Sequence, residues 1–325
     1  MKILAIQPKM TRRPMDTDLK AKMSPSLALL TIKSLTPSCH TVKIVNENIE
    51  RIDFDEDVDL VAITVTVDAL SRAARIAGRF REKGIPVVAG GIHITSAPYT
   101  AEGLFDALLI GRAESTWPDL LDDMAHRRIK SVYRDSCRDR VIQKPDYSIE
   151  KKSRYIYTNV VSTSRGCPHR CDFCYNSSAD AVPYMNRPVE DVLRDIDAIG
   201  RKHILFIDDN FCGNPEWTGA FLDALIPLKI KWSAAVCADI AKHPHLLDKM
   251  VESGCQSLFI GFESINSSSL RGVHKSQNDV GTYDKLIHEL HSRGIMINAS
   301  LVFGLQYDYV LTFTRTRACI HTIKI

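Results

Sequence analysis

The sequence predicts an α/β protein in which a doubly wound parallel sheet is followed by a partial βα barrel. Short β-branched or apolar runs alternate with amphipathic helical segments along most of the chain. Turns that contain glycine join these segments, as in parallel α/β folds. The length of 325 residues exceeds what one ordinary core accommodates, and it indicates about two domains.

The first domain is predicted to span residues 1–130 and to contain the doubly wound sheet. Residues 60–66 (LVAITVT) form a β-branched run that is typical of a strand buried on both faces. Residues 68–83 place apolar side chains at helical spacing, and Gly84 ends that helix. The other predicted strands of this domain are residues 2–8, 41–46, 86–90 and 107–110, and its last predicted helix is residues 115–125.

Three segments of this domain directly follow predicted strands, so they lie at the carboxyl edge where such sheets bind ligands. Glycines there let the backbone approach a bulky ligand, and hydroxyl or imidazole groups supply polar contacts. Ordinary turn chemistry explains the same residues. No G-x-G-x-x-G follows the first strand, which disfavours a dinucleotide. The candidate ligand contacts are Thr64, Thr66, Gly90, Gly91, His93, Gly111 and Glu114.

A charge-rich segment without sustained periodicity, residues 131–157, predicts an exposed linker. Residues 158–308 then alternate strands and helices again, as in the βα units of a TIM-like barrel. The predicted strands are residues 159–165, 203–207, 231–236, 257–262 and 296–303, and the predicted helices are residues 189–199, 215–226, 245–252 and 280–292.

Cysteine usage points to a metal site in the barrel half. The nine cysteines are an odd number at irregular spacing, which disfavours a disulfide framework. Three of them, Cys167, Cys171 and Cys174, lie in one loop after a predicted strand. Thiolates suit iron–sulfur clusters and zinc, and three thiolates leave the fourth iron of a four-iron cluster without a protein ligand. His169 lies in the same loop, so a Cys/His zinc site is the alternative.

The spacing C-x-x-x-C-x-x-C, with Phe173 before the last cysteine, resembles the signature of the radical S-adenosylmethionine (SAM) superfamily. The order of elements in the first domain and residues 87–95 (VVAGGIHIT) resemble the cobalamin-binding domain of such enzymes, although the Asp-x-His-x-x-Gly signature is absent. The resemblance implies a [4Fe-4S] cluster on the three cysteines and SAM chelated to the fourth iron. It also implies one-electron cleavage of SAM to a 5′-deoxyadenosyl radical, with cobalamin as a further cofactor.

The resemblance also carries over SAM contacts at the carboxyl ends of barrel strands, where βα barrels place their working residues. The candidate SAM-binding residues are Phe173, Asp208, Asp209, Glu263 and Ser264. Asn210, beside the two aspartates, could instead cap the following helix. Tyr175 and Phe262 could flank adenine or belong to the core.

Residues 309–325 are predicted to be an atypical tail, because threonine and arginine occupy positions where an amphipathic helix needs apolar residues. The family barrel continues further, so the sequence predicts a barrel truncated at its C-terminus. An open edge strand and reduced stability are expected from that.

Composition and charge restrict the partners and the compartment. A net charge of +3 disfavours a protein that coats nucleic acid. No apolar run reaches the roughly 18–20 residues of a membrane span, and the N-terminus does not resemble a secretory signal, so the predicted location is cytoplasmic. The expected partners are a small-molecule substrate and an external one-electron reductant of the flavodoxin or ferredoxin type.

The leading functional hypothesis is a cobalamin-dependent radical SAM enzyme that methylates, cyclises or rearranges an unactivated carbon. One alternative is a methylthiotransferase-like radical SAM enzyme, but Cys39 and Cys137 are too few for the second cluster that such enzymes carry. The other alternative is a non-catalytic metal-binding or corrinoid-binding module.

Overall fold

The structure is a computed structural model of the chain, and it describes residues 1–11, 16–17, 19, 22–136, 141–148 and 152–323. The chain divides into two compact units, one of Met1–Thr158 with Ser178–Val182 and one of Asn159–Ser177 with Pro183–Ile325. Within the described ranges, every helix is too short or too polar to cross a bilayer.

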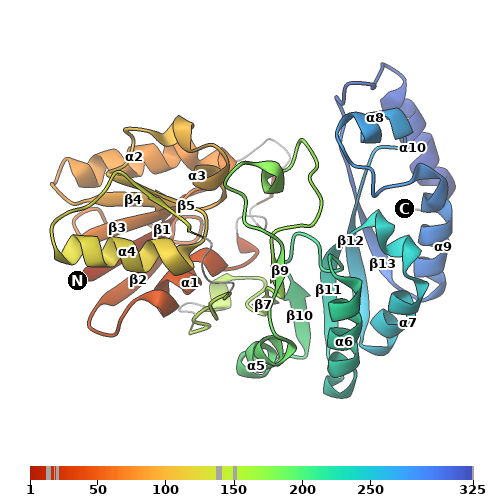
Figure 1. Ribbon diagram of the computed structural model, residues 1–325, viewed down its shortest axis with the longest axis horizontal. Helices are drawn as coiled ribbons and strands as arrows, with labels where there is room; N and C mark the ends of the chain where they lie inside the picture. The colour runs from red at the N-terminus through yellow and green to blue at the C-terminus, as the bar shows by residue number, and fades with distance from the viewer. Residues whose placement is uncertain (12–15, 18, 20–21, 137–140, 149–151, 324–325) are drawn as a thin grey trace. The chain divides into compact units, whose positions relative to one another are not determined.

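The first unit contains a six-stranded sheet in which every neighbouring pair of strands is parallel (Figure 1). Its strand order is β2-β1-β3-β4-β5-β6. The strands are β1 (Lys2–Gln7), β2 (Thr41–Asn46), β3 (Leu60–Thr64), β4 (Val87–Gly90), β5 (Ala107–Ile110) and β6 (Val132–Arg134). The helices are α1 (Leu27–Leu35), α2 (Leu70–Arg81), α3 (Ile92–Ser96) and α4 (Ala113–Ala125).

Helices cover both faces of this sheet because successive strand residues alternate between two hydrophobic cores. Ile63 of β3 packs with Phe80 of α2 in one core. Ala62, the preceding residue, packs with Trp117 of α4 in the other. The order 2-1-3-4-5 is the flavodoxin-like form of a doubly wound sheet, whose topological switch point lies between β1 and β3.

The prediction of an exposed linker over residues 131–157 is wrong at its start, where the chain forms the sixth strand. β6 pairs with β5 through Leu109↔Tyr133, and the Tyr133 side chain is buried. A strand of three residues with only one buried side chain has too short a pattern to be recognised from periodicity. The rest of the predicted linker that the structure describes also belongs to the first unit.

The second unit contains a five-stranded parallel sheet in the order β13-β12-β11-β10-β7. The strands are β7 (Val160–Val161), β10 (His203–Phe206), β11 (Lys231–Cys237), β12 (Cys255–Glu263) and β13 (Met296–Leu301). A separate antiparallel pair joins β8 (Ser164–Arg165) to β9 (Met185–Asn186). The helices are α5 (Val189–Ile199), α6 (Pro215–Leu225), α7 (Pro244–Glu252), α8 (Ser267–Gly272), α9 (Tyr283–Ser292) and α10 (Thr312–Ile323).

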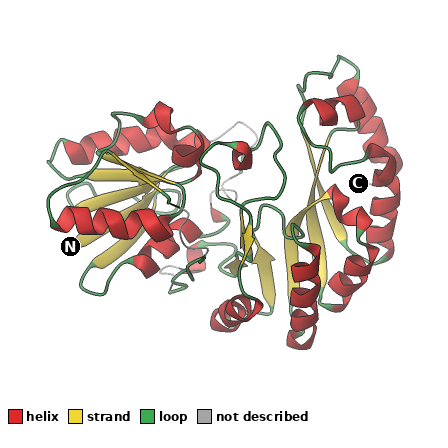
Figure 2. Cartoon of the chain, viewed as in Figure 1, coloured by secondary structure: helices red, strands yellow, loops and turns green. Residues whose placement is uncertain are grey.

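Helices α5, α6, α7 and α9 lie along the five-stranded sheet (Figure 2) and pack on it through one hydrophobic core. Aromatic side chains fill its centre, and the Phe211 and Trp232 rings lie 5.2 Å apart. Short 3-10 helices cover the connections, and they comprise η2 (Val67–Ala69), η3 (Pro98–Ala101), η4 (Lys152–Arg154), η5 (Tyr175–Ser177), η6 (Ile226–Leu228), η7 (Ala238–Lys242) and η8 (Val280–Thr282).

The prediction of an atypical tail over residues 309–325 is also corrected, because Thr312–Ile323 form the regular helix α10. Thr312 and Thr316 are buried, and they lie one turn apart on the same side of the helix. The buried positions of α10 therefore include small polar side chains, so a search for large apolar residues at helical spacing does not find this helix.

Candidate functional site

The cysteine loop leaves β8 at Gly166, whose φ of +71° favours glycine, and ends at η5. Cys171 is buried, and Cys167 and Cys174 are partly buried. The Cys174 amide donates to the Cys171 carbonyl at 2.9 Å. Burial raises the pKa of the Cys174 thiol, and the neighbouring Cys167 and Cys171 sulfurs raise it further. All three loop cysteines are therefore at least partly shielded from solvent.

Asp208 fixes the start of this loop from the end of β10. Its Oδ1 accepts hydrogen bonds from the Thr163 amide at 2.8 Å, the Ser164 amide at 2.6 Å and the Ser164 hydroxyl at 2.8 Å. Burial of this carboxyl raises its pKa to about 6, although those hydrogen bonds oppose the change. The predicted single strand over residues 159–165 is therefore wrong, because Asp208 binds backbone amides at the break between β7 and β8.

A buried ion pair lies at the end of β12. Glu263 Oε1 accepts from Lys275 Nζ at 3.0 Å, and both side chains are buried. Glu263 has φ of +62°, a conformation that is unusual outside glycine and is found at functional sites. Burial opposes the charge on Lys275, but the Cys237, Glu263 and Cys171 groups outweigh it and raise its pKa. A buried cation therefore lies near the Cys171 and Cys237 sulfurs.

Gln277 contacts a candidate cluster ligand directly. Its Nε2 donates to the Cys171 sulfur at 3.3 Å, and both side chains are buried. Hydrogen bonds to cluster sulfurs are one of the factors that set the reduction potential of an iron–sulfur centre. Sequence analysis missed Gln277 because its contact spans 106 residues and no local motif marks it.

The other candidate SAM residues differ in their surroundings. Asp209 accepts a hydrogen bond from the Tyr175 hydroxyl at 2.5 Å. The Phe173 ring is 46% exposed and lies 5.8 Å from Lys275 Nζ. Ser264 is buried, and its hydroxyl accepts from the Asn266 amide at 3.0 Å. Asp208, Asp209, Glu263 and Ser264 all lie at or just beyond the carboxyl ends of β10 and β12.

The contacts of Asn210 and Phe262 decide the two roles that the sequence left open for each of them. Asn210 does not cap α6, because Asn214 is the N-cap and its side chain accepts from the Trp217 amide. Asn210 Oδ1 instead accepts from the Cys237 amide at 3.4 Å and joins the ends of β10 and β11. Phe262 is a core residue, with its ring 4.7 Å from that of Tyr283.

Cys237, at the end of β11, is a fourth sulfur beside the cysteine loop. Its thiol donates a hydrogen bond to Cys167 and lowers the pKa of Cys167 to about 6. The pKa of Cys237 itself is raised by the same hydrogen bond and by burial. The predicted strand over residues 231–236 stopped one residue short of Cys237. Working residues of βα barrels lie at the carboxyl ends of strands, so the observed end of β11 would have marked Cys237 as a candidate.

In the first unit, the structure brings Thr64, Gly90, Gly91 and His93 together at the ends of β3 and β4. A Cβ at Gly91, whose φ is +103°, would lie 3.0 Å from Thr64 Oγ1. His93 is buried, and its Nε2 lies 2.9 Å from Thr100 Oγ1. Burial lowers the pKa of His93. The His93 ring therefore has a partner within its own unit.

The other three candidates of the first unit also have partners on their own unit. The Gly111 amide donates to Thr95 Oγ1 at 3.0 Å. Glu114 Oε1 accepts from the Gln143 amide at 3.0 Å. Thr66 is exposed, and its hydroxyl donates to Asp68 at 2.8 Å. The structure thus gathers the candidates that follow β3 and β4, whereas Gly111 and Glu114 lie after β5.

Comparison with known proteins finds a family model that matches the second unit. Residues 161–313 match the family model described as the Radical SAM superfamily. The chain carries a radical SAM domain. Its match includes the three cysteines of the loop and the ends of β10, β11 and β12.

Similar proteins extend over most of the chain. Bacteriochlorophyllide d C-8(2)-methyltransferase of Chlorobaculum tepidum is 29% identical over 315 residues, which are 90% of this chain and 70% of that protein. Hopanoid C-2 methylase of Rhodopseudomonas palustris is 25% identical over 338 residues, covering 94% of this chain and 63% of that protein. Both names are those of methyltransferases.

Solved structures of radical SAM enzymes share the fold of this chain. The radical SAM methyltransferase TsrM from Kitasatospora setae matches 99% of this chain and 71% of its own, with a TM-score of 0.79 at 16% identity. The cobalamin-dependent enzyme OxsB with aqua-cobalamin bound matches 95% of this chain and 50% of its own, with a TM-score of 0.71 at 17% identity. At such identities the likeness shows the fold.

Proposed function

We propose that the chain is a cobalamin-dependent radical SAM methyltransferase that acts on an unactivated carbon of a small molecule. The observation that carries this proposal is the cysteine loop, in which the Cys171 sulfur accepts a hydrogen bond from the buried Gln277 amide. The methyltransferase names of relatives that match 90% and 94% of this chain support it. The five-stranded sheet of the second unit is the proposed partial βα barrel.

The residues of the loop fit an iron–sulfur cluster by their chemistry. Cys167, Cys171 and Cys174 would hold it, because thiolates are the usual cluster ligands. The lowered pKa of Cys167 favours the ligating thiolate form. Lys275 would offset part of the negative charge of a thiolate-bound cluster. When bound, the cluster supplies the electron that cleaves SAM to methionine and a 5′-deoxyadenosyl radical.

We further propose that SAM is held at the carboxyl ends of β10 and β12. Asp209, oriented by Tyr175, offers a carboxylate to polar groups of SAM. Glu263 is restrained by Lys275 and by its own backbone conformation, and Ser264 lies next to it. Phe173 offers an exposed aromatic face. Asp208 acts by positioning, because its Oδ1 is committed to the start of the cysteine loop.

The first unit is proposed to bind cobalamin at the carboxyl edge of its sheet. This edge includes the β1/β3 switch point, where flavodoxin-like sheets bind their ligands. Gly90 and Gly91 continue the edge at the end of β4 with backbone free of side chains. Thr64, Thr66, His93, Gly111 and Glu114 are the further proposed contacts. When bound, cobalamin supplies a cobalt centre that carries the methyl group.

An external one-electron reductant of the flavodoxin or ferredoxin type is part of the proposal. We propose no nucleic-acid partner. A reducing cytoplasm suits the eight cysteines that the structure describes, all of which are free thiols.

Retention of the corrinoid tests the cobalamin part independently of SAM chemistry. The anaerobically purified chain is incubated with hydroxocobalamin and passed through a gel-filtration column. We expect about one corrinoid per chain to co-elute, as measured by its absorption spectrum. A chain that is folded by circular dichroism but elutes without corrinoid would rule out this assignment and leave the SAM assignment standing.

A further inference from the structure

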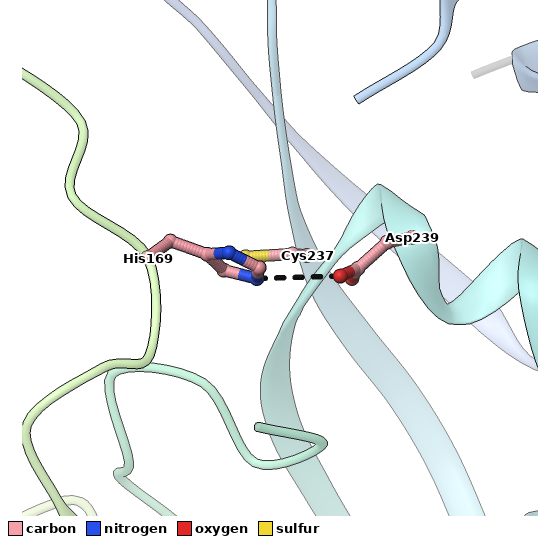
Figure 3. A group of neighbouring side chains, drawn as sticks. All are labelled: His169, Cys237 and Asp239. Atoms are coloured by element: carbon pink, nitrogen blue, oxygen red, sulfur yellow. Dashed lines mark ion pairs between the residues drawn. The ribbon is translucent and has the colours of Figure 1, made fainter. Parts of the chain in front are cut away.

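Three side chains that carry potential metal ligands lie together at the cysteine loop (Figure 3). His169 comes from the loop itself, Cys237 from the end of β11, and Asp239 from η7. One ligand atom from each of the three lies within 4.8 Å of the other two. His169 Nε2 is 3.2 Å from Asp239 Oδ2. Three different segments of the second unit therefore direct an imidazole, a thiol and a carboxylate toward one point.

From this geometry we infer that His169, Cys237 and Asp239 form a mononuclear zinc site, separate from the proposed cluster. This site goes beyond the proposed SAM chemistry, because none of its three ligands is a proposed cluster cysteine. Zinc would replace the thiol proton that Cys237 otherwise donates to Cys167. The fourth coordination position is left to water or another small ligand, as in zinc sites with three protein ligands.

The separations suit tetrahedral zinc. Ligand bonds of about 2.0 Å to nitrogen or oxygen and 2.3 Å to sulfur place two tetrahedral ligands of this set roughly 3.3–3.5 Å apart. The 3.2 Å between His169 and Asp239 matches the lower end of that range. The Cys237 sulfur needs to move by no more than about 1.3 Å toward the other two ligands, given the 4.8 Å limit on all three separations. A side-chain adjustment therefore completes the site without a change in the fold.

The donor set selects zinc among common ions. A thiolate and an imidazole favour zinc over calcium or magnesium, which prefer oxygen ligands. Ionised Cys237 and Asp239 with a neutral imidazole carry two negative charges, which a divalent ion balances. This neutrality matters because Cys237 is only 7% exposed, and an uncompensated buried charge is costly.

The position of His169 connects the two sites, because this residue lies between Cys167 and Cys171 in the chain. Zinc held by His169 and by residues of β11 and η7 would tie the cysteine loop to the barrel sheet. Asn210 supports the same strand end through the Cys237 amide.

Zinc titration of the full chain tests the site. The anaerobic protein, with its cluster reconstituted, is equilibrated with zinc chloride and desalted, and zinc and iron are measured by mass spectrometry. A competing chromophoric chelator gives the affinity. We expect about one tightly bound zinc per chain. The variants Cys237→Ser and Asp239→Ala should each weaken zinc binding by more than the roughly 10–100-fold that outer-shell substitutions cost.

Two control variants separate this site from the cluster. Cys255→Ser alters another buried thiol and should retain zinc. Cys171→Ser removes a proposed cluster ligand and should also retain zinc while it loses iron. Asp239 is about one quarter exposed, so Asp239→Ala decides the matter if Cys237→Ser does not fold. Absence of tight zinc from the unaltered chain would overturn the inference. So would unchanged binding in Asp239→Ala, or loss of zinc only in Cys171→Ser.

Discussion

The side-chain amide of Gln277 donates a hydrogen bond to the sulfur of Cys171 at 3.3 Å. The donor lies 106 residues after the acceptor, and both are buried. Such a donor stabilises the more negative, reduced state of a bound cluster. A residue outside the cysteine loop therefore adjusts the chemistry of the loop.

Substitution of Gln277 by leucine should lower the reduction potential of the reconstituted cluster. The amide donor is lost, so the reduced state loses about 1 kcal/mol of stabilisation, or roughly 40 mV for one electron. A redox titration followed by electron paramagnetic resonance measures this shift. The variant Gln256→Leu, at an exposed glutamine of β12, is the control and should leave the potential in place. A potential unchanged in Gln277→Leu would show that this hydrogen bond does not act on the cluster.

Lys275→Met should destabilise the second unit, because it leaves the Glu263 carboxylate buried without its cation. Breaking a buried ion pair in this way costs about 3–5 kcal/mol, which corresponds to a fall of roughly 10 °C in melting temperature. The double variant Glu263→Gln with Lys275→Met should recover part of that loss, since the uncompensated charge is gone. Thermal unfolding followed by circular dichroism measures both. A double variant no more stable than the single one would contradict this account.

The raised pKa of Asp208 predicts that the stability of the folded chain depends on pH. Its pKa rises from an ordinary value of 3.8 to about 6 in the folded chain, so the folded state binds this proton more tightly than the unfolded state does. As the pH rises from 4 to 6, the unfolded chain ionises first and the contribution of this group to stability falls, by about 3 kcal/mol in total. This decline levels off once the pH passes the folded-state pKa of about 6 and the carboxyl is ionised in both states.

Asp208→Asn should remove that decline. The melting temperature at pH 6.5 minus that at pH 4.5 is therefore expected to be more positive in Asp208→Asn than in the unaltered chain. Asp223→Asn, at an exposed carboxylate, should preserve the original difference. If Asp208→Asn and the unaltered chain showed the same pH dependence, the raised pKa would be wrong.

Gly91→Ala should weaken corrinoid retention if the ends of β3 and β4 form the proposed cobalamin edge. Its φ of +103° and the 3.0 Å approach to Thr64 Oγ1 leave little room for a methyl group, so the turn after β4 must shift. Gly103→Ala is the matched control, with φ of +74° and no atom within 4 Å of its Cβ. Co-elution with hydroxocobalamin distinguishes the two. Equal retention in both variants would argue against this edge.

Strands and helices whose side-chain patterns lie within one short segment could be predicted from the sequence. The β-branched run of β3 identified a doubly buried strand, while the assignment of Cys167, Cys171 and Cys174 as cluster ligands stays a prediction. The break between β7 and β8 could not be found in this way, because its cause is the Asp208 carboxylate from a distant strand end. Tertiary hydrogen bonds there prevail over local strand propensity.

The residues that contact the cysteine loop could not be predicted either, because they are distant from it in the sequence. Gln277, Cys237 and Asp239 lie 68 to 106 residues along the chain from the loop residues that they approach, Cys171 and His169. Only folding brings them to the same edge. The role of Lys275 also depends on tertiary structure, because its partner Glu263 comes from the end of β12.

Production of 5′-deoxyadenosine tests the central claim most directly. The anaerobically reconstituted chain is given SAM and a strong one-electron reductant, and the product is measured by liquid chromatography and mass spectrometry. The unaltered chain and Cys255→Ser should both form 5′-deoxyadenosine, and Cys171→Ser should form none. A chain with a full complement of cluster iron that leaves SAM intact, or a Cys171→Ser variant as active as the unaltered chain, would contradict reductive SAM cleavage at this loop.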